Sequence, residues 1–130
     1  MTKERPGVMK AFIILMVINA IITSVHYILI YIGVIPIKGD MATVMEFALA
    51  DAIVTVIPSV IGAYGLWQLK AWSLVPIMVL SGGYFHGMVV LLTQAVTKSK
   101  YGGMNFVSIY FIFFSILLII YLWKKRELFN

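Results

Sequence analysis

Four long apolar segments fill almost the whole chain, with only short polar stretches between them. Three of the four carry no charge, and they cover Ala11 to Ile37, Ala71 to Thr97 and Tyr101 to Trp123, with 27, 27 and 23 residues. The remaining segment, Met41 to Leu69, carries Glu46 and Asp51. Because a membrane-spanning helix needs about 20 apolar residues, each of the four segments is long enough to cross a bilayer.

The ends of the predicted helices follow from glycine, proline and charged residues. We expect helices over residues 10–33, 41–69, 71–96 and 104–123. Gly33 and Pro36 end the first helix, and Pro58 is expected to kink the second. Lys70 is almost the whole loop between the second and third helices, so these two are antiparallel neighbours. Continuous apolar runs exclude a β-barrel. The prediction is an all-α membrane protein, a single domain over residues 1–130 folded as an up-down-up-down bundle of four transmembrane helices.

The composition agrees with this class of protein. The chain is 62% hydrophobic and 12% charged, with a mean hydropathy of +1.03, which lies outside the range of soluble domains. It contains no cysteine. This excludes disulfide chemistry, a thiolate nucleophile and thiolate metal ligands.

The net charge of +5 is explained by membrane topology rather than by a nucleic-acid partner. On one side of a four-pass topology lie seven basic residues: Lys3, Arg5, Lys10, Lys70, Lys124, Lys125 and Arg126. On the other side lie three: Lys38, Lys98 and Lys100. The positive-inside rule then predicts that both termini are cytoplasmic.

Polar residues at one depth of the four helices are the main sign of a site. A charge near the bilayer centre costs about 3 kcal/mol on insertion scales, so Asp51 needs a structural or functional reason. Counting from the aromatic residues at the cytoplasmic edge, at about 1.5 Å per residue, places His26 and His86 roughly 21 Å above that edge. Ser108 lies at roughly 22 Å and Asp51 at roughly 24 Å, in the outer half of a hydrocarbon layer about 30 Å thick.

The helical faces add to this argument. Asn19, Thr23, His26 and Tyr27 form one stripe on the first helix. The first and third helices stand diagonally in such a bundle, so we expect both histidines to point at each other across the core, with Asp51 between them. Glu46, at roughly 31 Å, is either a solvated residue at the mouth of this site or its second carboxylate.

Four interpretations of this polar level remain open. Asp51 can pair with a histidine or with hydroxyl groups as glue between helices. The level can be a pocket for a small molecule or a lipid head group. His26, His86 and Asp51 suit zinc or iron as ligands, and two opposed histidines are the minimum requirement of a bis-histidine haem site. No cofactor is predicted, and no known catalytic motif is present.

One family resemblance adds a lipid-like ligand to these options. The residues concerned are, in order, Asp51, Pro58, Tyr64, Trp72, Pro76 and His86. This order resembles that of the EXPERA group, four-helix membrane proteins that include the emopamil-binding sterol isomerases and sigma-2-type receptors. The resemblance implies an intramembrane acidic residue on the second helix, here Asp51. The first helix departs from the pattern, since it carries His26 and no acidic residue, and the loop that follows it is shorter.

The sequence therefore predicts a small integral membrane protein that binds a lipid or small amphipathic molecule without catalysis. The ligand-binding residues would be Asp51, His26, His86, Tyr27, Ser108 and Glu46. One alternative is a membrane enzyme, an isomerase or a metal-dependent hydrolase that uses Asp51 and the two histidines as acid and base. Another is an accessory subunit of a larger membrane complex. The expected partners are membrane lipids, with a homodimer or a second membrane protein as further options and no nucleic acid.

Overall fold

The structure is a computed structural model that describes residues 5–37, 39–98 and 103–129. Outside the described residues lie the middle of the loop expected after residue 97 and three of the basic residues counted above, Lys3, Lys38 and Lys100. The described part contains four helices that are long and apolar enough to cross a membrane. The chain is thus an all-α four-helix bundle and an integral membrane protein, as the sequence predicts.

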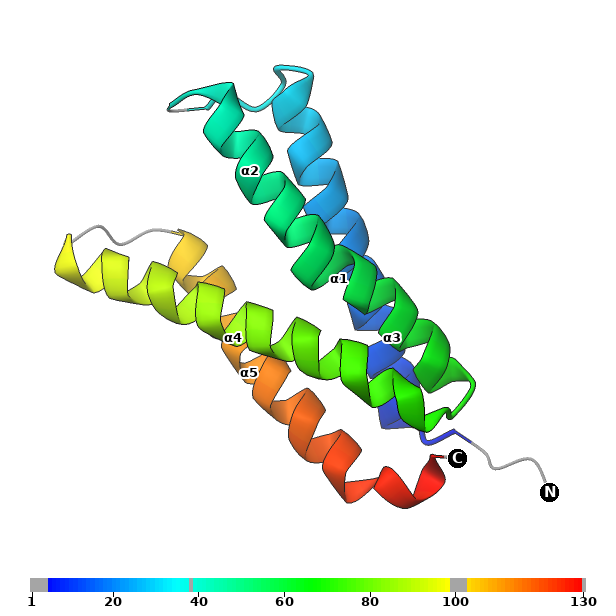
Figure 1. Cartoon of the computed structure of the whole chain (residues 1–130). Helices are drawn as coiled ribbons and strands as arrows, with labels where there is room; N and C mark the ends of the chain where they lie inside the picture. Colours follow the sequence, from blue (N-terminus) through cyan, green and yellow to red (C-terminus); the bar gives the residue numbers. More distant parts are fainter. Residues whose placement is uncertain (1–4, 38, 99–102, 130) are drawn as a thin grey trace.

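The four spans are built from the following elements. The first is α1 (Gly7–Tyr31); the second combines α2 (Met41–Asp51), the π-helical turn η1 (Ala52–Val56) and α3 (Ile57–Trp67). The third begins with the 3₁₀ turn η2 (Ala71–Ser73) and continues as α4 (Leu74–Thr97); the fourth is α5 (Gly103–Lys124), followed by the 3₁₀ turn η3 (Arg126–Leu128). Each helix end lies within three residues of the expected one. Successive spans run in opposite directions, and both ends of the chain lie at the same end of the bundle (Figure 1).

Two tight backbone motifs end the first two spans. After α1, Gly33 adopts a left-handed conformation with φ of 80°, and the Val34 N–H donates to the Leu29 carbonyl at 2.9 Å. This is the hydrogen bond of a Schellman motif. After α3, Leu69 takes the same left-handed position with φ of 56°, and the Lys70 N–H donates to the Gly65 carbonyl at 3.0 Å. The second loop is therefore short because the chain reverses within the cap.

Pro58 acts on the second span through a change of helix type. Proline has no N–H, so the Val54 carbonyl loses the donor that an α-helix would supply from residue 58. The preceding turn widens into η1, in which the Ile57 N–H bonds the Ala52 carbonyl, five residues back. The expected irregularity lies at the expected place, but the chain accommodates it as a π-helical turn.

The hydrophobic core occupies only the half of the bundle near the chain termini, here called the terminal half. Its largest fully buried side chains are Met9, Met16, Leu66, Ile77, Leu80 and Leu118. In this half α1 packs on α3, α3 on α4 and α4 on α5. The Phe12 and Phe114 rings, 5.9 Å apart, close the ring of helices between α1 and α5.

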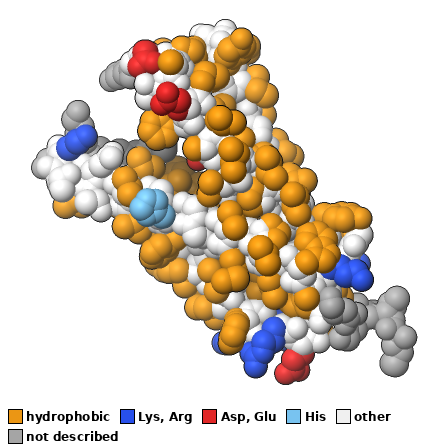
Figure 2. Space-filling model, viewed as in Figure 1, with side chains coloured by type: hydrophobic (Ala, Val, Ile, Leu, Met, Phe, Trp, Pro, Cys, Tyr) orange, Lys and Arg blue, Asp and Glu red, His pale blue; other side chains and the backbone are white. Residues whose placement is uncertain are grey.

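The other half, here called the loop half, is open. The structure buries no residue of α2, and beyond Ala20 the only buried residue of α1 is Ile30. The α1–α2 arm and the α4–α5 arm diverge in this half (Figure 1), and the space-filling view shows a hollow between them (Figure 2). At the expected polar level His26 and His86 are exposed and Asp51 is half-buried, whereas Ser108 is buried.

Candidate functional site

The central contact of the candidate site joins Asp51 to Tyr27. Asp51 is the last residue of α2, immediately before the π-helical turn, and Tyr27 lies on α1. The Tyr27 hydroxyl donates a hydrogen bond of 2.6 Å to the Asp51 carboxylate. Both side chains are half-buried. A short bond from a phenol to a carboxylate fixes the carboxylate's orientation and leaves its second oxygen for another donor.

The π-helical turn that follows Asp51 contacts this residue through its backbone. The Thr55 hydroxyl donates to the Asp51 backbone carbonyl at 2.6 Å, and Thr55 is buried. Because π-helical turns often mark functional sites in helices, the coincidence of this turn with an intramembrane acid singles out this level of the second span.

The two histidines do not lie inside a packed core. Both His26 and His86 are exposed, and the His26 ring packs edge-on against the neighbouring Tyr27 ring, with centroids 5.7 Å apart. The expectation that the histidines meet across a closed core with Asp51 between them is wrong. The physical reason is that the helix arms that carry them diverge, so the core ends below this level.

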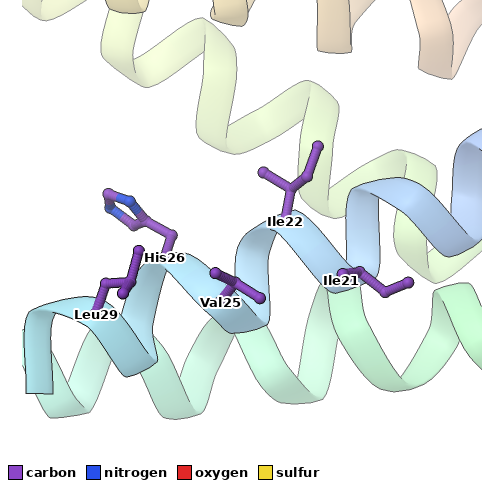
Figure 3. A pocket seen from close by; sticks show the side chains of 5 residues that line it. All are labelled: Ile21, Ile22, Val25, His26 and Leu29. Atoms are coloured by element: carbon purple, nitrogen blue, oxygen red, sulfur yellow. The ribbon is translucent and has the colours of Figure 1, made fainter. Parts of the chain in front are cut away.

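His26 lies instead in a shallow pocket on α1 of about 420 Å³. The pocket is lined by Ile21, Ile22, Val25, His26 and Leu29. Ile22 and His26 project toward the side on which α4 and α5 lie (Figure 3). The pocket thus combines an apolar wall with a single polar ring.

The remaining expected residues occupy different environments. Ser108 is buried in α5, whereas Glu46 is exposed on α2. Among the residues that the structure describes, no three histidine, aspartate or glutamate side chains come together as a metal site would require. The geometry therefore brings Asp51 and Tyr27 together, with His26 beside them, whereas His86 and Glu46 are exposed and Ser108 is buried in α5.

Sequence reasoning missed a second polar contact, on the side of α1 that faces α5. The Asn19 amide donates to the Tyr110 hydroxyl at 3.5 Å, and the Tyr110 ring packs at 5.0 Å from that of Phe111. Asn19 was on the expected polar stripe of the first helix, but its partner was not. An asparagine in a membrane span is itself a signal for such a bond between helices.

These features define a class of protein, a four-helix integral membrane protein in which a tyrosine–aspartate hydrogen bond joins two of the membrane-spanning segments. No protein-family model, curated protein or solved structure matches the chain. The resemblance to the EXPERA group is therefore without support from a family match.

Proposed function

We propose that the protein binds a lipid or a small amphipathic molecule, without catalysis, in the hollow between the α1–α2 and α4–α5 arms. Asp51 is the polar anchor, Tyr27 holds the carboxylate in place, and His26 contributes a further hydrogen-bonding group. The observation that carries this proposal is the hydrogen bond between the half-buried side chains of Tyr27 and Asp51, which joins the two helices of the α1–α2 arm.

The chemistry of the hollow suits an amphipathic occupant. A typical ligand pocket is mainly apolar and contains a few polar groups that orient the ligand. The α1 wall supplies exposed Ile22 and half-buried Leu29 beside His26, and the Asp51 carboxylate keeps an acceptor oxygen for a ligand hydroxyl or ammonium group. An apolar chain would lie along the wall while its polar end reaches Asp51.

The proposal is tested by thermal unfolding of the purified protein with a panel of amphiphiles. The panel contains a lipid extract, a fatty alcohol, a fatty amine, a fatty acid and a lysophosphatidylcholine. At about 100 times its Kd a ligand stabilises the folded state by about 2.7 kcal/mol, which raises Tm by about 5 °C or more. We expect at least one amphiphile to do this for the wild type and to lose its effect in Asp51→Asn.

Glu46→Gln is the matched control, because it neutralises an exposed carboxylate on the same helix. It should keep the full response of the wild type. The proposal fails if no amphiphile raises Tm of the wild type, or if Asp51→Asn responds as the wild type does. Mass spectrometry of the recovered amphiphile separates binding from the enzyme alternative, since an enzyme would return a chemically altered molecule.

A second candidate, an accessory subunit of a membrane complex, is favoured by α2, in which no residue is buried. A partner helix could cover its apolar side chains, Phe47 and Leu49 among them. A photoreactive amino acid at Phe47, activated in native membranes, tests this. A discrete protein adduct would favour the subunit role, and labelling of lipid alone would favour the binding role.

A further inference from the structure

Three buried hydroxyl groups lie in the middle of the bundle without a hydrogen-bond partner. They belong to Ser59 of α3 and to Ser81 and Tyr84 of α4, whose residues are 0%, 1% and 4% exposed. None of the three hydroxyl oxygens has a partner within the described part of the chain. Buried polar groups in proteins are almost always hydrogen-bonded, and an unbonded hydroxyl is most unfavourable in a membrane, where lipid offers no partner.

The packing of α3 on α4 brings the two serines to the same level. A Cβ atom added to Gly62 would lie 2.8 Å from the Ile77 side chain, so these two residues face each other. Ser59 lies three residues from Gly62, and Ser81 lies four residues from Ile77. Both steps keep a residue on the same helical face. Since the helices are antiparallel, Ser59 and Ser81 occupy the same depth of the α3–α4 interface.

Tyr84 extends this cluster toward Asp51. It lies three residues after Ser81 on α4, and its hydroxyl is close to that of Ser59, without hydrogen-bond geometry between them. Tyr84 also lies within electrostatic range of the Asp51 carboxylate. On the second span, Asp51, Thr55 and Ser59 follow one another at intervals of four residues. Ser59 thus lies about two turns beyond Asp51 along the second span, and Tyr84 is the member of the cluster that feels the Asp51 charge.

The missing partners are not a general property of serine in these helices. The Ser115 hydroxyl of α5 donates to the Phe111 carbonyl at 2.7 Å, and the Ser24 hydroxyl donates to the Ala20 carbonyl at 2.8 Å. Such bonds to the preceding turn are the usual way in which a helical serine satisfies its hydroxyl. Ser59 and Ser81 make no such bond, although Ser115 is as deeply buried as Ser81.

We propose that Ser59, Ser81 and Tyr84 form a buried hydration site, and that its ligand is water. An internal water molecule makes two to four hydrogen bonds to polar groups that are otherwise unsatisfied, and three hydroxyls at one level supply this number. The site continues the polar contact of Asp51 and Tyr27 into the middle of the bundle. The proposal does not depend on the ligand proposed for the hollow.

Cysteine reactivity tests for water at this place, because the natural chain contains no cysteine. Ser59→Cys and Ser81→Cys each replace one oxygen by sulfur, and only a hydrated thiol ionises to the reactive thiolate. The probes are silver ion and the ethylammonium methanethiosulfonate reagent. We expect both variants to react with silver ion at least 10-fold faster than Ser115→Cys, the control of equal burial. Rates equal to that of Ser115→Cys overturn the proposal.

A second measurement uses the sign of a stability change. If the hydroxyls were dry, removing one would relieve an unsatisfied polar group, and Ser59→Ala would raise Tm. If they bind water, Ser59→Ala and Ser81→Ala remove a partner of that water and lower Tm by a few degrees. Ser115→Ala, which loses one bond to its own helix, calibrates the effect of removing a satisfied hydroxyl. A rise in Tm for Ser59→Ala overturns the hydration site even if the cysteine variants do not fold.

Discussion

At the scale of single residues, the Asp51–Tyr27 hydrogen bond ties α1 to the second span above the level at which the hydrophobic core ends. Neither residue is held by dense packing, since both side chains are half-buried. A carboxylate in this position is costly in a membrane unless it has a donor. The Tyr27 hydroxyl supplies that donor at 2.6 Å, so Tyr27 offsets part of the free-energy cost of placing the Asp51 carboxylate in the membrane.

Tyr27→Phe removes this donor and keeps the ring that packs against His26. Hydrogen bonds between membrane helices contribute about 0.6 kcal/mol on average and up to about 1.7 kcal/mol. We expect a loss of about 1 kcal/mol in the free energy of unfolding, measured by reversible unfolding in detergent. Tyr31→Phe, which removes an exposed hydroxyl from the same helix, should change nothing. If the two variants behave alike, the bond contributes no stability.

The sequence could predict which polar residues share a depth, but not which of them meet. Counting residues along a helix fixes height and face to within a turn. That was enough to place Asp51 and Tyr27 at one level. It could not show that Tyr27 rather than a histidine is the partner of Asp51, nor that His26 and His86 are exposed. Those facts depend on the angle between the helix arms, which no spacing along one helix encodes.

At the scale of elements, glycine sets how closely the second and third spans approach. A Cβ atom added to Gly83 of α4 would overlap the Val54 side chain in the π-helical turn, whereas one added to Gly82 would meet nothing. Neighbouring glycines thus differ in role. The π-helical turn and Gly83 therefore lie in close contact, which the position of Pro58 in the sequence could not reveal.

Gly83→Ala is therefore expected to destabilise the bundle. Overpacking at a tight contact costs about 1–3 kcal/mol, and the α4–η1 contact must open to accept the methyl group. Gly82→Ala should be neutral or stabilise by up to about 1 kcal/mol, because alanine favours helix more than glycine does. Thermal unfolding of the two variants side by side measures the difference. Equal stability would mean that α4 does not rely on close contact with Val54.

The start of α2 gives a prediction for pH. The Thr43 N–H and hydroxyl each donate to the Asp40 carboxylate at 2.8 Å. The backbone hydrogen bond from Thr43 contributes most to holding the pKa of Asp40 below its usual range. A lowered folded-state pKa stabilises the protein above the unfolded pKa, about 3.9, and this contribution is lost as pH falls through the folded value.

Asp40→Asn keeps an oxygen acceptor for the helix cap but does not titrate. We expect the wild type to lose stability relative to Asp40→Asn as the pH is lowered from 5 to below about 4. The measurement is Tm of both proteins across this interval. A constant difference in Tm would show that the cap has no dependence on its charge.

At the scale of the whole molecule, the distribution of charge gives an orientation. Lysine and arginine side chains gather at the end that carries the chain termini (Figure 2). There the Arg5 guanidinium lies 4.4 Å from the centre of the Trp67 ring, and the Arg126 guanidinium lies 5.1 Å from the centre of the Trp123 ring. Tryptophan and basic residues together are typical of a membrane interface, and an excess of basic residues marks the cytoplasmic one.

We therefore expect both termini in the cytoplasm. Reporter domains fused after Asn130 and inserted after Lys38 should label opposite sides of the membrane, the first inside and the second outside. Removing basic residues tests whether they set this orientation. Replacing Lys124, Lys125 and Arg126 by glutamine should increase the fraction of molecules inserted in the opposite orientation. A C-terminal reporter on the outer side of the natural protein would refute the orientation.

The two arms share a packed core only in the terminal half, so we expect their separation in the loop half to respond to an occupant of the hollow. Spin labels on cysteines at Phe47 of α2 and Val96 of α4, both exposed, report this separation. We expect a broad distance distribution in detergent that narrows and shifts when a stabilising amphiphile is added. A second pair at Val60 of α3 and Val75 of α4, also exposed but in the packed half, should give one narrow distribution under both conditions. Because the protein has no natural cysteine, only the chosen positions carry a label.

An unchanged distance distribution for the first pair, with an amphiphile that raises Tm, would show that the ligand binds without moving the arms. A change in both pairs would mean that the terminal half is not the fixed base on which the arms turn.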